Sequence, residues 1–265
     1  MNNFTFRSKQ SLGQNFLTDD NVARKIIKAI APKPEDIIVE IGPGFGALTR
    51  HLVDACCQVI AVEIDKRLSE KLAEKFVHFP NFTLITNDFL DVEIQKYFQP
   101  GKNLRIVGNI PYHITSPVIF KIFEIREHVR DMILMIQREV AQRIVAKTRT
   151  KDYGILSVFS QLYSEPKILF HVSKNVFNPK PDVDSTDIRW DFSRAPEVLI
   201  KDKPLLDKII RASFNQRRKM LRKSLQQLED ISEKLHSIDF DLKKRPEELS
   251  FHDFVQLSNI LTRLL

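Results

Sequence analysis

The sequence contains little cysteine and no long apolar run. Its only two cysteines, Cys56 and Cys57, are neighbours, which places them poorly for an ordinary disulfide and is typical of small apolar residues in a reduced compartment. Its seven histidines have no Cys or His partner at metal-ligand spacing, so we expect no metal site. The longest apolar runs, such as residues 132–136, are far shorter than the roughly 20 residues that span a bilayer. With no apolar signal region at its start, the chain is expected to be cytoplasmic and not to bind a membrane.

Short apolar strands alternate with helical segments over much of the chain. Strands are predicted at residues 36–41, 58–64, 82–86, 104–108 and 131–137. Helices are predicted at residues 19–30, 47–56, 66–77, 116–123 and 139–147. Because nearly continuous apolar strands that alternate with helices are typical of parallel sheets, this order predicts an α/β fold with a doubly wound sheet.

Glycine is also scarce, and none lies within residues 205–265. That stretch has no convincing strand, and its pattern predicts three or four helices, one of them starting at Pro246. A polar stretch around Pro196 and Pro204 precedes it. We therefore expect two domains, residues 1–197 and residues 198–265.

The first predicted strand ends in a glycine-rich turn, Gly42-Pro-Gly-Phe-Gly46. A strand, a tight glycine turn and a helix form the usual nucleotide-binding loop, in which the backbone approaches the ligand closely. Glu63 ends the second strand, roughly twenty residues past the first glycine, where such folds bind ribose hydroxyls. We interpret Glu63 as a ribose ligand; a solvated carboxylate at a strand end is the alternative.

Both NAD and S-adenosylmethionine fit a ribose-binding carboxylate. The spacing here is GxGxG rather than GxGxxG, and Glu40 precedes it. An acidic side chain favours the cationic amino-acid moiety of S-adenosylmethionine because it would repel a pyrophosphate. After the third strand, Asp88 can accept a hydrogen bond from the adenine amine while Ile64 and Phe89 sandwich the ring. The alternative for Asp88 is a helix N-cap.

The tetrapeptide Asn109-Ile-Pro-Tyr112 follows the fourth strand. An exocyclic amine on a base is a poor nucleophile because its lone pair is delocalised into the ring. Two oxygens, the side-chain carbonyl of Asn109 and the backbone carbonyl of Ile110, can accept its N–H groups, localise the lone pair and aim it at a methyl group. Pro111 stiffens the turn, and Tyr112 offers an aromatic face for a base removed from its stack. A plain Asn-Pro turn is the alternative.

In this order the motifs resemble those of the ribosomal RNA adenine N6,N6-dimethyltransferase family, and more narrowly its small-subunit (KsgA/RsmA/Dim-type) branch. They are SLGQNFL at residues 11–17, VEIGPGFGALT, VEID, NDFLD, VGNIPYHI and the loop VFNPKPDVDS at residues 176–185. The resemblance implies a Rossmann-like class I S-adenosylmethionine-dependent methyltransferase sheet with a small all-helical C-terminal domain. The chain departs from the family pattern at residues 147–154, where a Pro-Gly turn is expected before Tyr153.

The resemblance also implies site residues. It assigns cofactor contacts to Asn15, Leu17, Gly42, Glu63, Asp88 and Asn109. The candidate cofactor set, completed from the motifs, is Gln14, Asn15, Leu17, Glu40, Gly42, Gly44, Glu63, Ile64, Asp88, Phe89 and Asn109. The candidate catalytic set is Asn109, Ile110, Pro111, Tyr112 and Phe177. Phe177 is expected to pack on the flipped adenine opposite Tyr112, although without the loop motif it would be interpreted as one of many core phenylalanines.

The charge of the chain is unevenly distributed. The net charge is +7, from 41 Lys and Arg against 34 Asp and Glu. Residues 213–223 hold five cations and no acid, and residues 137–151 hold five cations and one acid. Such clusters suit a phosphate backbone, although a solvated helix face is the alternative. The candidate RNA-binding set is Arg138, Arg143, Lys147, Arg217, Arg218, Lys219, Arg222 and Lys223.

Residues 215–224 match the family's C-terminal helix, and the segment from residue 245 to 254 matches later motifs of the small-subunit branch. The resemblance thus implies an enzyme that dimethylates the N6 amines of two adjacent adenosines in a hairpin loop near the 3′ end of 16S rRNA. Its partner would be the small ribosomal subunit, with a role in subunit biogenesis, and we expect a monomer. The alternatives are an assembly factor whose catalysis is secondary and a resistance-type methyltransferase of large-subunit rRNA.

Overall fold

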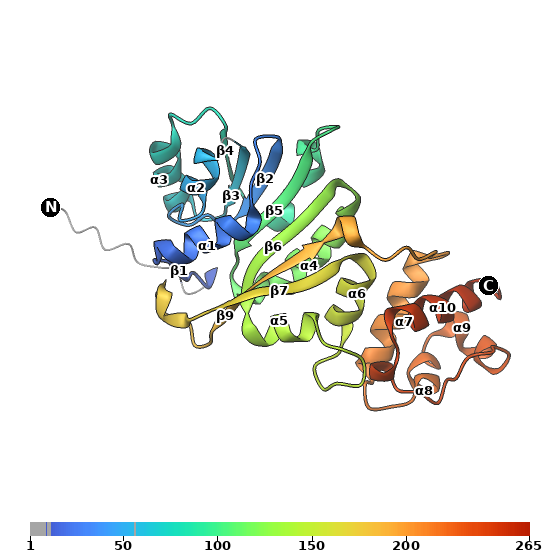
Figure 1. The fold of residues 1–265 in the computed structure, drawn as a ribbon. Coiled ribbons are helices and arrows are strands. Elements are labelled where there is room, and N and C mark those ends of the chain that lie inside the picture. Colours follow the sequence, from blue (N-terminus) through green and yellow to red (C-terminus); the bar gives the residue numbers. More distant parts are fainter. Residues whose placement is uncertain (1–8, 10–11, 56) are drawn as a thin grey trace. The chain divides into compact units, whose positions relative to one another are not determined.

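A computed structural model describes residue 9, residues 12–55 and residues 57–265 (Figure 1). Ser11 of the first motif and Cys56 therefore lie outside the described residues. The chain forms two compact units. Unit 1 comprises the described part of Met1–Ala141 together with Lys167–Ser193, and unit 2 comprises Gln142–Pro166 and Arg194–Leu265. Residues 142–166 thus belong to unit 2, whereas the predicted division at residues 197/198 places them in the first domain.

Unit 1 contains a seven-stranded sheet in the order β4-β3-β2-β5-β6-β9-β7. Its strands are β2 (Asp36–Ile41), β3 (Gln58–Glu63), β4 (Phe82–Thr86), β5 (Asn103–Asn109), β6 (Val129–Gln137), β7 (Glu165–Val172) and β9 (Ser185–Asp191). The first five strands of that order run parallel, and β9 is antiparallel to β6. The α/β class and the five predicted strands are confirmed, whereas β7 and β9 were not predicted.

A second, two-stranded sheet pairs β1 (Phe16–Leu17) with β8 (Phe177–Asn178). The helices of unit 1 and its border are α1 (Asp20–Ile30), α2 (Thr49–Asp54), α3 (Lys66–Phe76), α4 (Thr115–Glu124) and α5 (Arg138–Ile144). The helix predicted at residues 47–56 is shorter than expected because residues 44–48 form turns. None of the described helices is both long and apolar enough to cross a bilayer.

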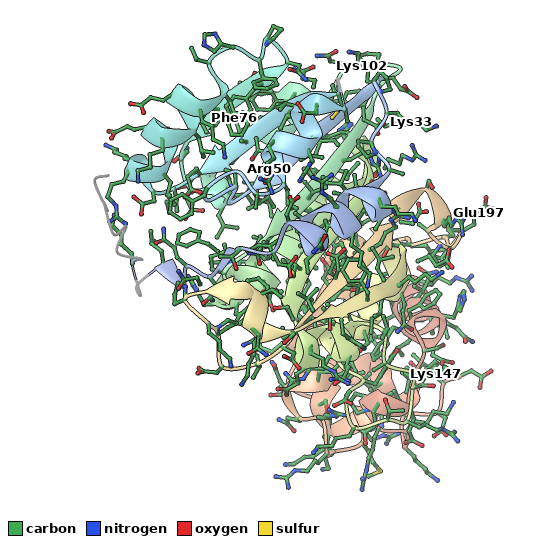
Figure 2. The ribbon with its side chains drawn as sticks, turned by 60° about the vertical axis from the view of Figure 1, so that its left-hand side comes forward. Lys33, Arg50, Phe76, Lys102, Lys147 and Glu197 are labelled. Carbon is green, nitrogen blue, oxygen red and sulfur yellow. The ribbon has the colours of Figure 1, made fainter. Side chains whose placement is uncertain are left out.

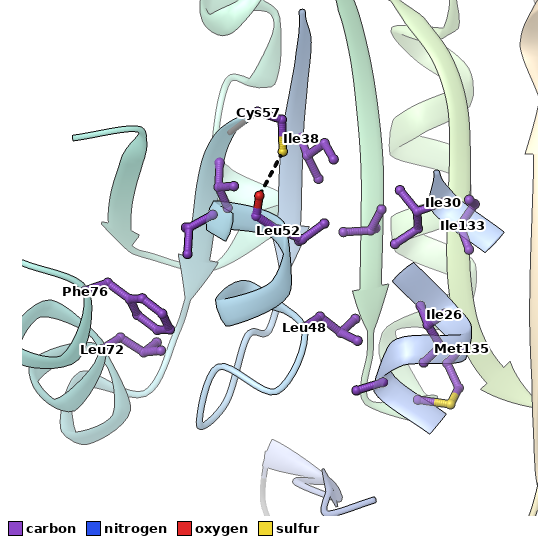
Figure 3. Close-up of a cluster of buried hydrophobic side chains, with 14 of the residues drawn as sticks. Ile26, Ile30, Ile38, Leu48, Leu52, Cys57, Leu72, Phe76, Ile133 and Met135 are labelled. Atoms are coloured by element: carbon purple, nitrogen blue, oxygen red, sulfur yellow. Dashed lines mark hydrogen bonds between the residues drawn. The ribbon is translucent and has the colours of Figure 1, made fainter. Parts of the chain in front are cut away.

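Helices α1, α2 and α3 cover one face of the sheet around a hydrophobic cluster, and α4 lies behind the sheet in the view of Figure 1. In the cluster, Ile26 and Ile30 of α1 meet Ile133 and Met135 of β6 (Figure 3). The cluster forms because all six residues of β2 are buried and α1 presents its apolar positions at helical spacing. The Cys57 thiol donates to the carbonyl of Leu52 at 3.2 Å (Figure 3).

A buried ionic network joins the amino-terminal ends of three strands. Arg105 of β5 forms two hydrogen bonds with Asp131 of β6, at 2.7 and 2.8 Å, and one with Asp36 of β2, at 2.9 Å. Its guanidinium also donates to the carbonyl of Ile30, at 2.7 Å. Because a guanidinium offers five donors and the carboxylates only accept, the buried charges satisfy one another. The network fixes neighbouring strands at the end of the sheet opposite to Ile41 and Asn109.

Unit 2 is helical. Its helices are α6 (Ile155–Tyr163), α7 (Lys203–Asn215), α8 (Leu221–Leu225), α9 (Glu229–Ser232) and α10 (Phe251–Thr262). Helix α7 packs against α6, α8 and α10. It begins with Pro204 in its first turn and Asp202 as its N-cap, which accepts from the Leu205 N–H at 2.8 Å.

The C-terminal prediction holds in most respects. In the described part of residues 205–265 there is no strand, and Pro246 starts a short 3-10 helix, Pro246–Glu248. The predicted single helix over residues 215–224 is wrong. Helix α7 ends at Asn215, residues 216–219 form a turn and a bend, and α8 starts at Leu221. The basic cluster therefore spans a helix–turn–helix junction.

Candidate active site

A pocket lies at the carboxyl ends of β2, β3 and β5. The register puts Ile41 beside both Val62 and Gly108, so the residues that follow these strands meet at one edge of the sheet. The pocket has a volume of about 250 Å3. All eleven residues of the candidate cofactor set line it, and so do Ile110, Pro111 and Tyr112. Residues that are scattered from the first motif to the fourth strand are thus brought together.

The turn after β2 needs glycine at three positions, Gly42, Gly44 and Gly46, where φ is positive. Gly42 has a φ of 63° and Gly44 a φ of 61°, which is the left-handed region that other residues rarely adopt. A Cβ atom on Gly44 would lie 2.9 Å from the ring of Phe16. The Gly44 N–H donates to Glu63 Oε2 at 3.1 Å. The turn is therefore tight and is fixed directly to the end of β3.

Glu63 is buried, and both of its oxygens accept a backbone N–H. Oε2 accepts from Gly44 and Oε1 from Asp65, the latter at 3.0 Å. Burial nevertheless raises the pKa of Glu63 above its usual range. A carboxylate has about four acceptor sites, so each oxygen keeps capacity for a ribose hydroxyl. The contacts orient the carboxylate and are compatible with the predicted role.

Glu40 is buried close to Glu63. It accepts a hydrogen bond from the Thr49 hydroxyl at 2.7 Å. Burial, together with the negative charge of Glu63, raises the pKa of Glu40 to about 7. Two carboxyl groups in a partly apolar pocket disfavour a pyrophosphate and favour a ligand that carries positive charge. The cationic amino group and the sulfonium of S-adenosylmethionine are compatible with these two acidic side chains.

The predicted adenine-binding residues line the pocket. Phe89 is buried and Ile64 is exposed, and both line the pocket with Asp88. Asp88 Oδ1 accepts from the N–H of Leu90 at 2.8 Å and caps a short 3-10 helix, Phe89–Asp91. Asp88 is thus an N-cap, as in the alternative interpretation, and its second oxygen is compatible with a ligand contact.

The orientation of Asn109 is set by the N-terminal segment. Its Nδ2 donates to the backbone carbonyl of Asn15 at 3.0 Å. Because a carbonyl can only accept, the NH2 end of the amide must face Asn15, and Oδ1 is directed to the other side. Asn109 and Ile110 both line the pocket. The structure thus brings both predicted acceptor residues to the pocket and fixes the amide of Asn109.

Tyr112 starts a short 3-10 helix, Tyr112–Ile114, after Pro111. Its hydroxyl is 2.9 Å from Oγ of Ser185, the last residue of the VFNPKPDVDS loop. This contact brings the loop motif next to the Asn109–Tyr112 tetrapeptide. Burial raises the pKa of the Tyr112 hydroxyl, which stays a neutral partner for Ser185.

Phe177 is in a different place from the rest of the catalytic set. It is 5% exposed, packs in the hydrophobic cluster of unit 1 and is not among the residues that line the pocket. The structure thus shows the core interpretation of Phe177, and the stacking contact on a base stays a prediction.

The structure ties four residues to the site that have no predicted role, Phe16, Asp65, His113 and Ser185. Ser185 bonds Tyr112, and Phe16 and His113 line the pocket. The Asp65 side chain accepts from Gln14 at 3.0 Å. The sequence signals for Asp65 are its place in the VEID motif and its N-cap position before α3, and neither predicts a contact with residue 14.

The candidate RNA-binding residues are exposed, with one exception. Arg217 is half-buried in unit 2, where its Nε is 3.2 Å from Glu247 Oε2 and its NH2 donates to the carbonyl of Thr150 at 3.0 Å. Lys147 lies at the surface (Figure 2). The exposed members are Arg138, Arg143, Lys147, Arg218, Lys219, Arg222 and Lys223. Among the described side chains, no group of three or more His, Cys, Asp and Glu residues could hold a metal ion.

Comparison with known proteins decides the family. The chain matches the ribosomal RNA adenine dimethylase family over residues 5–263. It belongs to this family. It is 44% identical over 251 residues to the ribosomal RNA small subunit methyltransferase A of Chlorobium phaeobacteroides, covering 94% of this chain and 89% of that one.

Solved structures of similar chains agree with the fold. A dimethyladenosine transferase from Plasmodium falciparum is 25% identical, with a TM-score of 0.76, covering 91% of this chain and 95% of that one. The 23S rRNA methyltransferase ErmE is 26% identical, with a TM-score of 0.67, covering 94% and 100%. The Rossmann-like methyltransferase fold and the recognition of the family from its motifs are confirmed.

The Glu63 carboxylate can be tested by substitution. Glu63→Ala removes the ribose partner and frees the Gly44 N–H, so we expect affinity for S-adenosylhomocysteine to fall about tenfold or more, as for a lost hydrogen bond to a charged group. Glu74→Ala, at an exposed position on α3, is the matched control and leaves the affinity unchanged. Calorimetric titration measures both. Equal affinities for Glu63→Ala and the parent chain would show that Glu63 does not bind the cofactor.

Proposed function

We propose that this protein transfers methyl groups from S-adenosylmethionine to the N6 amines of two adjacent adenosines near the 3′ end of 16S rRNA, in the small ribosomal subunit. The observation that carries the proposal is the orientation of Asn109, whose NH2 group is bound to the Asn15 carbonyl while its oxygen is directed away from it. We also propose that the protein acts in the cytoplasm, is a monomer and has a role in the biogenesis of the small subunit.

The residues act mainly by positioning and by accepting hydrogen bonds. When bound, S-adenosylmethionine supplies an electrophilic methyl group on a sulfonium. Asn109 Oδ1 and the Ile110 carbonyl accept the two N–H groups of the adenine amine, which turns its lone pair out of conjugation and toward the methyl carbon. Formation of the N–C bond would break the C–S bond of the sulfonium and leave S-adenosylhomocysteine as the neutral product. The nitrogen, which then carries the positive charge, would release its proton to solvent without a dedicated base.

A second methyl transfer requires the same site to accept the monomethylated amine. That amine has one N–H group left, so only one of the two acceptors can be used. Tyr112 holds the base by its aromatic face in both rounds, and its hydroxyl is fixed by Ser185. The small-subunit substrate is favoured over the large-subunit alternative by the 44% identity to a protein named for the small subunit.

The direct test of this function is to map the label. The protein is incubated with labelled S-adenosylmethionine and, separately, with undermethylated small subunits, large subunits and free rRNA. We expect label in two adjacent adenosines of 16S rRNA. Label confined to large-subunit rRNA would favour the resistance-type alternative. Tight binding to immature small subunits without any transfer would favour the assembly-factor alternative.

The exposed cations of unit 2 provide a second prediction. Arg218 is exposed, whereas its neighbour Arg217 is engaged with Glu247 and Thr150. We expect Arg218→Ala to weaken RNA binding and to lower the slope of log affinity against log salt by about one, as for a lost phosphate contact. Filter binding over a range of KCl concentrations measures the slope.

The matched variant is Arg217→Ala. It should lower the melting temperature because it removes an ion pair and a hydrogen bond within unit 2, and Arg218→Ala should leave that temperature unchanged. Neither variant should alter affinity for S-adenosylhomocysteine. An unchanged salt slope for Arg218→Ala would exclude Arg218 from the RNA contact.

A further inference from the structure

The N-terminal segment of residues 12–18, here called the strap, is held to unit 1 at three places. The Gln14 side chain donates to Asp65 Oδ2 at 3.0 Å. The Asn15 carbonyl accepts from Asn109 at 3.0 Å. The Thr18 N–H donates to the Val176 carbonyl at 2.9 Å, beside the pairing of β1 with β8. The strap thus links the corner after β3, the end of β5 and the VFNPKPDVDS loop.

The side chain of Asp65, which accepts the hydrogen bond from Gln14, is held in a fixed position. It is completely buried and forms two hydrogen bonds with Arg67, whose Nε is 3.0 Å from Oδ1 and whose NH2 is 2.6 Å from Oδ2. Lys9 Nζ lies 3.6 Å from Oδ1. Hydrogen bonds from Arg67, and with them the one from Gln14, hold the pKa of Asp65 well below its usual range. Asp65 is therefore an anion at every pH at which the enzyme would be assayed.

Both ends of the Gln14 amide are occupied by the protein itself. Its NH2 group is bound to Asp65, and its Oε1 accepts the Lys9 N–H at 2.8 Å. Gln14 lines the pocket, but this bonding leaves its amide fixed in one orientation. Its contacts indicate that Gln14 anchors the strap, rather than serving first as a cofactor ligand.

The anchored residue is directly followed by the one that orients Asn109. One peptide unit separates Gln14 from Asn15, so fixing the Gln14 side chain restricts where the Asn15 carbonyl can lie. Without that carbonyl, the Asn109 amide has no fixed partner for its NH2 group and can rotate its oxygen away from an incoming amine. Small errors in such positions are costly in rate, because the acceptor must meet the reacting group within a few tenths of an ångström.

We propose that Asp65 is a positioning residue for methyl transfer, which acts through Gln14 to hold the strap over the cofactor and to keep the Asn15 carbonyl on Asn109. The proposal deepens the proposed function and rests on it for the reaction that Asn109 performs. It assigns a role to a carboxylate that does not line the pocket and has no place in the candidate cofactor set.

The first test compares Gln14→Ala, Asp65→Asn and the double variant. Each single variant is expected to weaken S-adenosylhomocysteine binding about tenfold, as for a lost hydrogen bond to a charged group, and to lower kcat at saturating cofactor. The double variant should lose no more affinity than the more affected single variant, because the two substitutions remove the same hydrogen bond. Glu70→Gln, an exposed charge change on α3, is the control and behaves as the parent chain.

The second test uses the permanent charge of Asp65. Gln14→Glu places a carboxyl group against an anion, so its affinity for S-adenosylhomocysteine, relative to the parent chain at the same pH, should be lowest at pH 8. The Asp65 anion raises the pKa of the introduced carboxyl group above its ordinary value of about 4.3. As the pH falls toward that value, the group becomes protonated, can donate to Asp65 as the amide does, and should restore the affinity toward that of the parent. A merely structural defect would not recover in this way.

Hydrogen exchange gives a readout that does not depend on activity. S-adenosylhomocysteine should protect the amides of residues 15–18 in the parent chain and in Glu70→Gln, and should protect them less in Gln14→Ala. Parent-like binding and exchange in Gln14→Ala, losses that multiply in the double variant, or a Gln14→Glu defect that ignores pH would each overturn the role of Asp65. Failure of the proposed function is seen separately, as an absence of label in the 16S rRNA of the parent reaction.

Discussion

The site depends on the parallel register of β2, β3 and β5. Ile41 pairs with Val62 on one side and with Gly108 on the other, so three strands end at the same level. Gly108 allows this closeness, because a Cβ atom there would lie 2.7 Å from the Ile41 carbonyl oxygen. At the other end of the strands, Arg105 joins neighbouring strands through buried ion pairs. The sheet is thereby fixed at both ends, and Asn109 follows a backbone that has little freedom to shift.

On this rigid edge, the groups that recognise ligands are carried by short turns and by one segment from far away in the sequence. The glycine turn supplies backbone donors, of which the Gly44 N–H is already bound to Glu63. The strap supplies the Asn15 carbonyl. The direction of the Asn109 amide thus depends on two elements that are nearly a hundred residues apart, the end of β5 and the strap.

Much of the fold and site could be predicted because the signals are local. A strand that ends in Gly42-Pro-Gly-Phe-Gly46, or a tetrapeptide such as residues 109–112, carries its own geometry, and the shared register does the rest. The antiparallel insertion of β9 between β6 and β7 could not be predicted, because it depends on strand order and not on any local pattern. The junction at residues 216–220 was missed for a related reason, since a basic run has no periodicity that marks a turn.

Contacts between polar residues that are distant in the sequence could not be predicted either. Nothing in the sequence pairs Gln14 with Asp65 or Tyr112 with Ser185, since each contact exists only after the sheet has formed. The loop motif predicts a contact between Phe177 and a base; the side chain packs in the core of unit 1, and the contact with a base stays a prediction. The ion pair of Arg217 with Glu247 is a further contact that the basic run does not predict.

The central claim is that Asn109 works through the direction of its amide. The most direct measurement is the single-turnover rate of methyl transfer in Asn109→Asp with cofactor and RNA saturating. A carboxylate cannot donate to the Asn15 carbonyl, so the acceptor should lose its direction and the rate should fall by about 100-fold, the scale of a lost transition-state contact, with RNA affinity unchanged. A variant that transfers methyl groups at the parent rate would contradict the role of the Asn15–Asn109 hydrogen bond.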